Sequence, residues 1–304
     1  MSSFQVIARG PDRVGESPLW DDRLQALWWV DIESRCIRRW LSASGAVTSW
    51  VLPERIGCIA LADDGRVIAA LESRIVAVRL DDAGATDLED LAVIQHPGAG
   101  MRFNDGRCDA AGRLWVGSMV MDMSLGLALG GLYCLDERGL RGPHVEGLYT
   151  SNGSAFSPDA RTFYLSDSHP RSQQIWAFDF DLAHGRLANR RPFVDMRDRP
   201  GRPDGAAVDR QGCYWICAND AGLVHRFSPS GRLLQSVPVP FPKPAMCCLG
   251  GEDLRTLFVT SIMPADPALD THGMSGAVIA LQTEVAGQAE PRFSRFPATA
   301  LQAQ

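Results

Sequence analysis

The chain has 304 residues, a formal net charge of −6 and a pI near 5.5, a balance that argues against a nucleic-acid partner. No run reaches the ~20 apolar residues of a membrane span, and the amino-terminal residues lack the apolar core of a signal peptide. We therefore expect a cytoplasmic protein with no membrane association. No linker rich in Pro, Gly or Ser and no charged block divides the sequence, so we expect a single domain over residues 1–304.

Six segments share one pattern, a polar turn followed by a short run of β-branched or aromatic residues. Their central apolar residues, called the anchors below, are in chain order Trp28, Ile68, Trp115, Tyr164, Trp215 and Phe258. Successive anchors lie 40, 47, 49, 51 and 43 residues apart. A period of about 40–50 residues with several short strands per unit is typical of β-propeller blades. The repeat predicts an all-β, six-bladed β-propeller with four-stranded blades and a central channel.

Further strand-like runs lie between the anchors, at 73–80, 131–135, 174–180 and 223–227. The terminal segments Phe4–Ala8 and Ala277–Leu281 also read as strands. Pairing the first of them with the last blade would close the ring and remove a free sheet edge. A β-sandwich or a pair of β-barrels would also contain many short strands, but neither requires six copies of one unit.

The eight cysteines lie mostly within apolar strand runs, at positions 36, 58, 108, 134, 213, 217, 247 and 248. No CxxC pair occurs, and without an export signal a disulfide framework is not expected. Cys213 and Cys217 would share one face of a strand at ~13 Å, too far apart to hold one ion. We expect structural thiols.

A second regularity appears 11 or 12 positions before each anchor, at Glu16, Gly57, Asn104, Asn152, Asp204 and Cys247. Equivalent positions of a propeller form a ring around the channel. Four of these six residues carry oxygen donors, which suit a hard divalent cation, and the blades of Gly57 and Cys247 would leave room. The lack of histidine donors argues against structural zinc. The alternative is that Asn-Gly and Asp-Gly only mark hairpin turns.

Arg102 precedes Asn104 by two residues and places a cation beside this ring. Its guanidinium could hold a substrate oxygen, or it could pair with Asp105 or with a blade carbonyl. None of the six histidines belongs to a nucleophile motif, and no G-x-S-x-G elbow is present. A Ser-His-Asp hydrolase is therefore not expected.

At these positions the chain resembles the SMP-30/gluconolactonase/luciferin-regenerating family, also called the regucalcin family. The matching motifs are 15–20 (GESPLW), 102–106 (RFNDG), 151–153 (SNG) with 156–159 (FSPD), 203–205 (PDG), and 250–251 (GG) before 257–261 (LFVTS). The resemblance implies a six-bladed propeller with one divalent cation, held by Glu16, Asn152 and Asp204. It implies that Arg102 and Asn104 face the substrate and that the activity is hydrolysis of sugar-acid lactones.

Family members that act on sugar lactones often carry an acidic residue after the strand that ends here at Met119. Asp122 is the candidate for contacting a sugar hydroxyl, within a segment, 119–131, that we expect to form a lid. The cation could be Ca²⁺, Zn²⁺, Mn²⁺, Mg²⁺ or Fe²⁺, and the expected partner is a small sugar lactone, with no obligate protein partner.

We expect the cation to polarise the lactone carbonyl and Asp204 to accept a proton from the attacking water. Because a carboxylate that binds a cation is a weaker base, delivery of the nucleophile by the cation itself is the competing mechanism. Two other functions remain open. One is a hydrolase of the same fold acting on organophosphates or other esters, and the other is a non-catalytic calcium-binding propeller.

Overall fold

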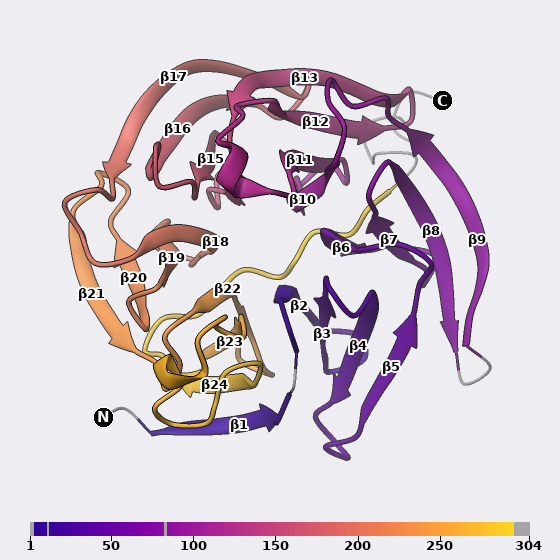
Figure 1. Ribbon diagram of the computed structural model, residues 1–304. Helices are drawn as coiled ribbons and strands as arrows, with labels where there is room; N and C mark the ends of the chain where they lie inside the picture. Colours follow the sequence, from indigo (N-terminus) through magenta and orange to yellow (C-terminus); the bar gives the residue numbers. More distant parts are fainter. Residues whose placement is uncertain (1–2, 11, 82–83, 295–304) are drawn as a thin grey trace.

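The computed structural model describes residues 3–10, 12–81 and 84–294, and in it six antiparallel sheets of four strands surround a central axis (Figure 1). Blade 1 contains β2 (Gly15–Asp21), β3 (Ala26–Asp31), β4 (Cys36–Leu41) and β5 (Val47–Val51). Blade 2 contains β6 (Cys58–Leu61), β7 (Val67–Ala70), β8 (Arg74–Asp81) and β9 (Gly84–Val93). Blade 3 contains β10 (Met101–Cys108), β11 (Leu114–Val120), β12 (Gly130–Asp136) and β13 (Gly139–Leu148).

The remaining three blades repeat this order. Blade 4 contains β14 (Ser151–Phe156), β15 (Thr162–Asp167), β16 (Gln174–Asp181) and β17 (Arg186–Asp195). Blade 5 contains β18 (Arg202–Val208), β19 (Tyr214–Asn219), β20 (Leu223–Phe227) and β21 (Leu233–Pro238). Blade 6 contains β22 (Pro244–Gly250), β23 (Thr256–Ser261), β24 (Val278–Gln282) and the amino-terminal strand β1 (Phe4–Ala8). The predicted six-bladed propeller is confirmed.

Ring closure also follows the prediction. Strand β1 pairs antiparallel with β24, with Phe4 opposite Leu281 and Val6 opposite Ile279. The last blade is therefore built from both ends of the chain, as Figure 1 shows at the lower left. This pairing satisfies the backbone groups of an edge that would otherwise be exposed.

Each anchor lies in the second strand of its blade, and all six side chains are buried. The apolar clusters that contain them span neighbouring sheets; Trp28, for example, belongs to the same cluster as Ile59 of blade 2. Two anchors also use a polar turn residue, because Trp115 Nε1 donates to Asp109 at 2.9 Å and Trp215 Nε1 donates to Asp209 at 2.9 Å. The repeat thus reflects packing between blades, which fills the space that a flat sheet would leave open.

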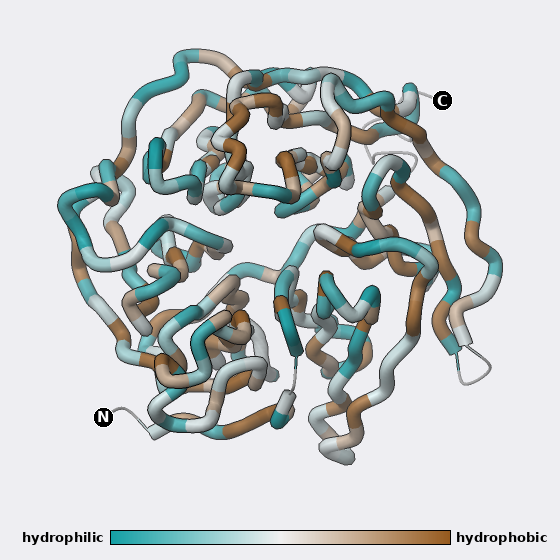
Figure 2. Tube along the Cα trace, viewed as in Figure 1, coloured by the Kyte–Doolittle hydropathy of each residue, from teal (hydrophilic) through white to brown (hydrophobic). Residues whose placement is uncertain are grey.

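Hydrophobic and hydrophilic residues alternate along much of the trace, and the outer strand β17 is largely hydrophilic (Figure 2). All eight cysteines are buried and unpaired, in agreement with structural thiols. The only helices among the described residues are the 3₁₀ turns η1 (Met123–Leu125) and η2 (Pro267–Leu269). No helix in this part of the chain has the length and apolar character to cross a membrane.

After β24 the chain crosses the molecule again as an extended segment, residues 284–294, which we call the closing segment (yellow in Figure 1). It contacts blades that are not neighbours: next to blade 5, Arg210 N donates to Ala286 O at 2.9 Å, and in blade 2, Phe293 N donates to Leu61 O at 2.7 Å. These contacts lie at the carboxyl-terminal ends of the inner strands β18 and β6. The closing segment therefore covers the channel mouth opposite to the end where Glu16, Asn152 and Asp204 lie.

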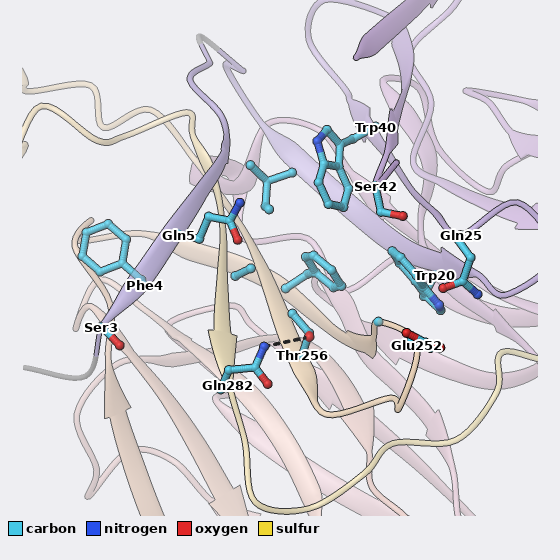
Figure 3. Close-up of a pocket in the computed structure, with 14 residues that line it drawn as sticks. Ser3, Phe4, Gln5, Trp20, Gln25, Trp40, Ser42, Glu252, Thr256 and Gln282 are labelled. Atoms are coloured by element: carbon cyan, nitrogen blue, oxygen red, sulfur yellow. Dashed lines mark hydrogen bonds between the residues drawn. The ribbon is translucent and has the colours of Figure 1, made fainter. Parts of the chain in front are cut away.

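A pocket of about 490 Å³ lies at the seam between blades 6 and 1 (Figure 3). Trp20 and Phe258 stack there with ring centroids 5.4 Å apart, and Trp40 packs beside them. None of the site residues expected from the sequence lines this pocket. The expected site residues lie instead on the inner strands that line the channel.

Candidate metal centre

Five of the six inner strands carry a register irregularity at the same place. It falls between Glu16 and Leu19 in β2, Phe103 and Gly106 in β10, Asn152 and Ala155 in β14, Pro203 and Ala206 in β18, and Pro244 and Cys247 in β22. A bulge turns side chains away from the strict alternation of a strand. Four of the five irregularities begin at or next to an oxygen donor expected from the repeat; the exception is the one in β22, where the expected residue is Cys247. The common phase in the sequence therefore corresponds to a common backbone feature.

The structure brings the expected residues of blades 3 and 4 into direct contact. Asn104 Nδ2 donates to Asn152 Oδ1 at 2.9 Å and to Ser151 O at 2.7 Å. Arg102 Nη1 donates to Asn104 Oδ1 at 2.5 Å and to Phe103 O at 2.9 Å. Arg102 thus pairs with a blade carbonyl and with Asn104, and not with Asp105.

Glu16 and Asp204 approach the same region from blades 1 and 5, and both are buried. Burial, followed by the charges of Asp204 and Asp105, raises the pKa of Glu16 well above its usual range. Burial raises the pKa of Asp204 to about 7, against an opposing effect of Arg202. The two carboxyl groups therefore share one weakly solvated environment in which a positive charge would be stabilised.

Asp105 is a channel residue that the sequence analysis missed. Its Oδ2 accepts a hydrogen bond from Ser154 N at 2.7 Å, while its buried Oδ1 has no partner among the described residues. Burial raises its pKa to about 6. The sequence signal was its place directly after Asn104, because a bulge can turn two consecutive side chains toward one side.

These donors fit a hard divalent cation. Two buried carboxyl groups and the Asn152 amide offer oxygen donors, and the buried Asp105 Oδ1, which has no hydrogen-bond partner among the described residues, adds a further one nearby. Among the residues that the structure describes, no three side chains of the types His, Cys, Asp or Glu lie close enough to hold one ion. A site based on Glu16 and Asp204 thus requires the amide of Asn152.

Gly57 and Cys247 are the two residues without an oxygen donor among the six that lie 11 or 12 positions before an anchor. Their role is more than to leave room around the candidate site. A Cβ at Gly57 would lie 2.3 Å from Phe103 O and 2.8 Å from Asn104 Cα. Glycine is required there because the backbone of blade 3 approaches blade 2 at the residues beside the site. Cys247 is buried in the apolar cluster between blades 5 and 6.

The segment 119–131, which the sequence predicts to form a lid, contains a shorter loop. Residues 119–120 end β11 and residues 130–131 begin β12, so the loop covers 121–129. It is attached to blade 4 by His169 Nε2, 3.0 Å from Met123 O, and by Arg171 Nη1, which donates to Gly126 O at 3.1 Å. Asp122 is exposed and caps η1 by accepting from Ser124 N and Oγ at 3.0 and 2.6 Å. Its contact with a sugar hydroxyl stays a prediction.

The raised carboxyl pKa values predict a pH effect on the stability of chelator-treated protein. The folded pKa values of Asp204 and Asp105, about 7 and about 6, exceed the usual unfolded value of about 3.9. Above pH 4 the unfolded chain therefore releases protons that the folded chain retains. We expect the free energy of unfolding, measured by urea titration, to fall between pH 4 and 8, by up to about 1.4 kcal/mol per pKa unit.

The Asp204→Asn variant is the control for this pH effect because it removes one of the two carboxyl groups. Its free energy of unfolding should fall less over the same interval, and addition of a divalent cation at pH 8 should stabilise the wild type. An equal fall in both proteins would show that the pKa of Asp204 is not raised in the folded state.

Comparison with known proteins identifies the family of this chain. Residues 14–263 match the SMP-30/Gluconolactonase/LRE-like region. The chain is 37% identical to a 6-deoxy-6-sulfogluconolactonase of Pseudomonas putida, over 96% of this chain and 99% of that protein. It is 33% identical to an L-arabinolactonase of Azospirillum brasilense, over 96% of both chains.

A solved structure shares the whole architecture. The crystal structure of a calcium-binding protein, regucalcin, from Agrobacterium tumefaciens superposes with a TM-score of 0.89 at 25% identity, covering 96% of this chain and 98% of that one. The family match spans most of the sequence, including the strands that carry Glu16, Asn104, Asn152 and Asp204. This chain belongs to the SMP-30/gluconolactonase/LRE-like family.

Proposed function

We propose that this protein is a lactonase that hydrolyses a sugar-acid lactone to the open-chain acid with the help of one divalent cation. The observation that carries this function is the set of buried oxygen donors from three blades, Glu16, Asn152 and Asp204, at one mouth of the channel. The names of the two lactonase relatives support the reaction class, and the donor chemistry supports the cation.

When bound, the cation would supply Lewis acidity to the lactone carbonyl. Asp204 would accept a proton from the water that attacks the carbonyl carbon; its buried carboxyl group lies at the channel mouth beside the other candidate ligands. The carbonyl-carbon bond to the ring oxygen then breaks, and the ring oxygen takes up a proton to become a hydroxyl. Water is the only co-reactant.

The remaining residues would bind and orient the substrate. Arg102 is held by Asn104 Oδ1 and Phe103 O, which leaves other N–H groups of its guanidinium for the hydroxyls or the carbonyl of the sugar. The loop 121–129 lies beside blade 4 and carries the exposed apolar side chains Leu125 and Leu127. These could exclude water from the substrate when the lactone is bound.

We infer that the substrate is a hexonolactone with an anionic substituent or a pentonolactone, and the names of the two lactonase relatives support this choice. The test is proton release from a panel of aldono- and aldarolactones and 6-deoxy-6-sulfogluconolactone, with spontaneous hydrolysis subtracted. Chelator-stripped protein is assayed alone and with Ca²⁺, Zn²⁺, Mn²⁺, Mg²⁺ or Fe²⁺ in turn. We expect turnover of at least one lactone that depends on the added cation.

Different negative results have different meanings. Cation binding without turnover of any lactone would overturn the lactonase function and favour an ester or organophosphate hydrolase, or a non-catalytic calcium-binding propeller. Turnover that is unchanged by chelation and by added cation would overturn the metal dependence while keeping the lactonase.

A further inference from the structure

Two polar residues behind the candidate ligands occupy the same position of the repeat. Ser168 and Asn219 each lie four residues after the anchor of their blade, Tyr164 and Trp215, at the end of the second strand. Both are buried, with exposed fractions of 3% and 2%. Each contacts the candidate ligand of its own blade and a proline carbonyl on the first strand of the next blade.

In blade 4 the hydroxyl of Ser168 determines how Asn152 is oriented. Ser168 Oγ donates its single proton to Pro203 O at 2.5 Å, so toward Asn152, 2.7 Å away, it can only accept. The group of Asn152 that faces Ser168 must therefore be the NH₂. This contact directs Asn152 Oδ1 to the other side, where it accepts from Asn104 Nδ2 at 2.9 Å and keeps one lone pair for a cation.

In blade 5 two cations determine how Asn219 is oriented. Arg202 Nη2 and Lys243 Nζ both lie 3.5 Å from Asn219 Oδ1, and neither group can accept a hydrogen bond. The NH₂ of Asn219 therefore faces Asp204 and donates to Asp204 Oδ2 at 2.7 Å, with a longer bond of 3.3 Å to Pro244 O. One lone pair of Asp204 Oδ2 is thereby used, whereas Oδ1 accepts no hydrogen bond from Asn219 and keeps both lone pairs for a ligand in the channel.

We propose that Ser168 and Asn219 are positioning residues that select which oxygen of Asn152 and of Asp204 points into the channel. The inference rests on the proposed metal site and adds the residues that orient its ligands. Removing a hydrogen bond to a ligand side chain commonly lowers metal affinity or activity by about 10–100-fold. Because both residues also bridge to the next blade, they fix the ligands of blades 4 and 5 relative to the neighbouring inner strands.

The test compares chelator-stripped wild type with Ser168→Ala and Asn219→Ala, using calorimetric titration with Mn²⁺ and with Ca²⁺. We expect the Kd of each variant to rise by about 10–100-fold. We expect Ser168→Thr, which keeps the hydroxyl, to recover most of the affinity. If Asn219→Ala does not fold, Asn219→Ser shortens the side chain with less loss of polarity and should show the same direction.

Ser261→Ala is the matched control. Ser261 is as buried as Ser168, donates to Ala277 O at 2.8 Å and accepts from Gly276 N at 2.9 Å, but it belongs to blade 6 and touches no candidate ligand. We expect it to lower Tm while leaving the Kd for the cation within about twofold of the wild type.

The outcomes separate positioning from mere stability. If Ser168→Ala and Asn219→Ala lower Tm as Ser261→Ala does but keep the wild-type Kd and kcat, the two residues are structural only and the inference is wrong. A wild type that binds and needs the cation for turnover supports the proposed function whatever these variants do. A wild type that binds no cation would overturn the metal site and this inference with it.

Discussion

Asp204→Asn is expected to lower kcat for lactone hydrolysis by about 10²–10⁴-fold, the usual contribution of a positioned general base. In the wild type Asn219 Nδ2 donates to Asp204 Oδ2 at 2.7 Å. The substitution keeps the shape of the side chain and an oxygen that can accept this hydrogen bond. What it removes is the carboxylate that would accept the proton. The measurement is initial rate by proton release, with the cation present at saturation.

Calorimetric titration of the same variant separates the two roles given to Asp204. Retained cation binding with lost turnover would assign the proton transfer to Asp204, whereas lost binding would assign it a ligand role. Asp179→Asn is the control, because Asp179 is exposed on β16 and pairs with Arg191. A variant at Asp204 that keeps kcat within threefold of the wild type would exclude Asp204 from the chemistry.

The propeller could be predicted because its repeat is a packing requirement. Each anchor fills the same space between two sheets, so Trp28 and Trp215 are interchangeable in role although their neighbours differ. The ring of donors could be predicted for the same reason, since equivalent positions of a symmetric fold lie at equivalent distances from the axis. The phase marked four oxygen donors, Glu16, Asn104, Asn152 and Asp204, and the choice of three of them as cation ligands came from the resemblance to the family.

What the sequence could not indicate depends on contacts between blades and on local irregularity. Asp105 lies in the channel because β10 is irregular between Phe103 and Gly106, and no alternation rule anticipates that. The orientation of the Asn219 amide is determined by Arg202 and Lys243, and these two residues come together only in the folded propeller. Ser168 and Asn219 both lie four residues after the anchor of their blade, and this shared position can be read from the sequence. The two residues differ in chemistry, however, so they form no common motif that would single them out.

The closing segment was not anticipated because it belongs to no repeat. Its role depends on one interaction inside the channel. Arg107 Nη1 lies 2.6 Å from Glu290 Oε2, and the same guanidinium donates to Ser154 O at 3.1 Å and to Ala206 O at 2.8 Å. Arg107 thus joins blades 3, 4 and 5 to the segment that crosses beneath them.

Glu290→Leu is expected to lower the free energy of unfolding by about 3–5 kcal/mol, the usual cost of leaving a buried charge without its partner. The side chains of Arg107 and Glu290 are 9% and 13% exposed, so water can replace little of the lost interaction. Urea titration at pH 7 measures the change. It would be among the largest effects of a single substitution outside the candidate metal centre.

The exposed pair Arg191–Asp179, with side chains 46% and 52% exposed, provides the comparison. Breaking it in Asp179→Asn should cost at most about 1 kcal/mol, because solvent screens both charges. A loss below 1 kcal/mol in Glu290→Leu would mean that the closing segment can detach without unfolding the blades. The expected large loss would instead show that the closing segment stabilises the whole propeller. Each sheet of a propeller packs on its two neighbours, whereas this segment hydrogen-bonds to blades 2 and 5, which are not neighbours in the ring.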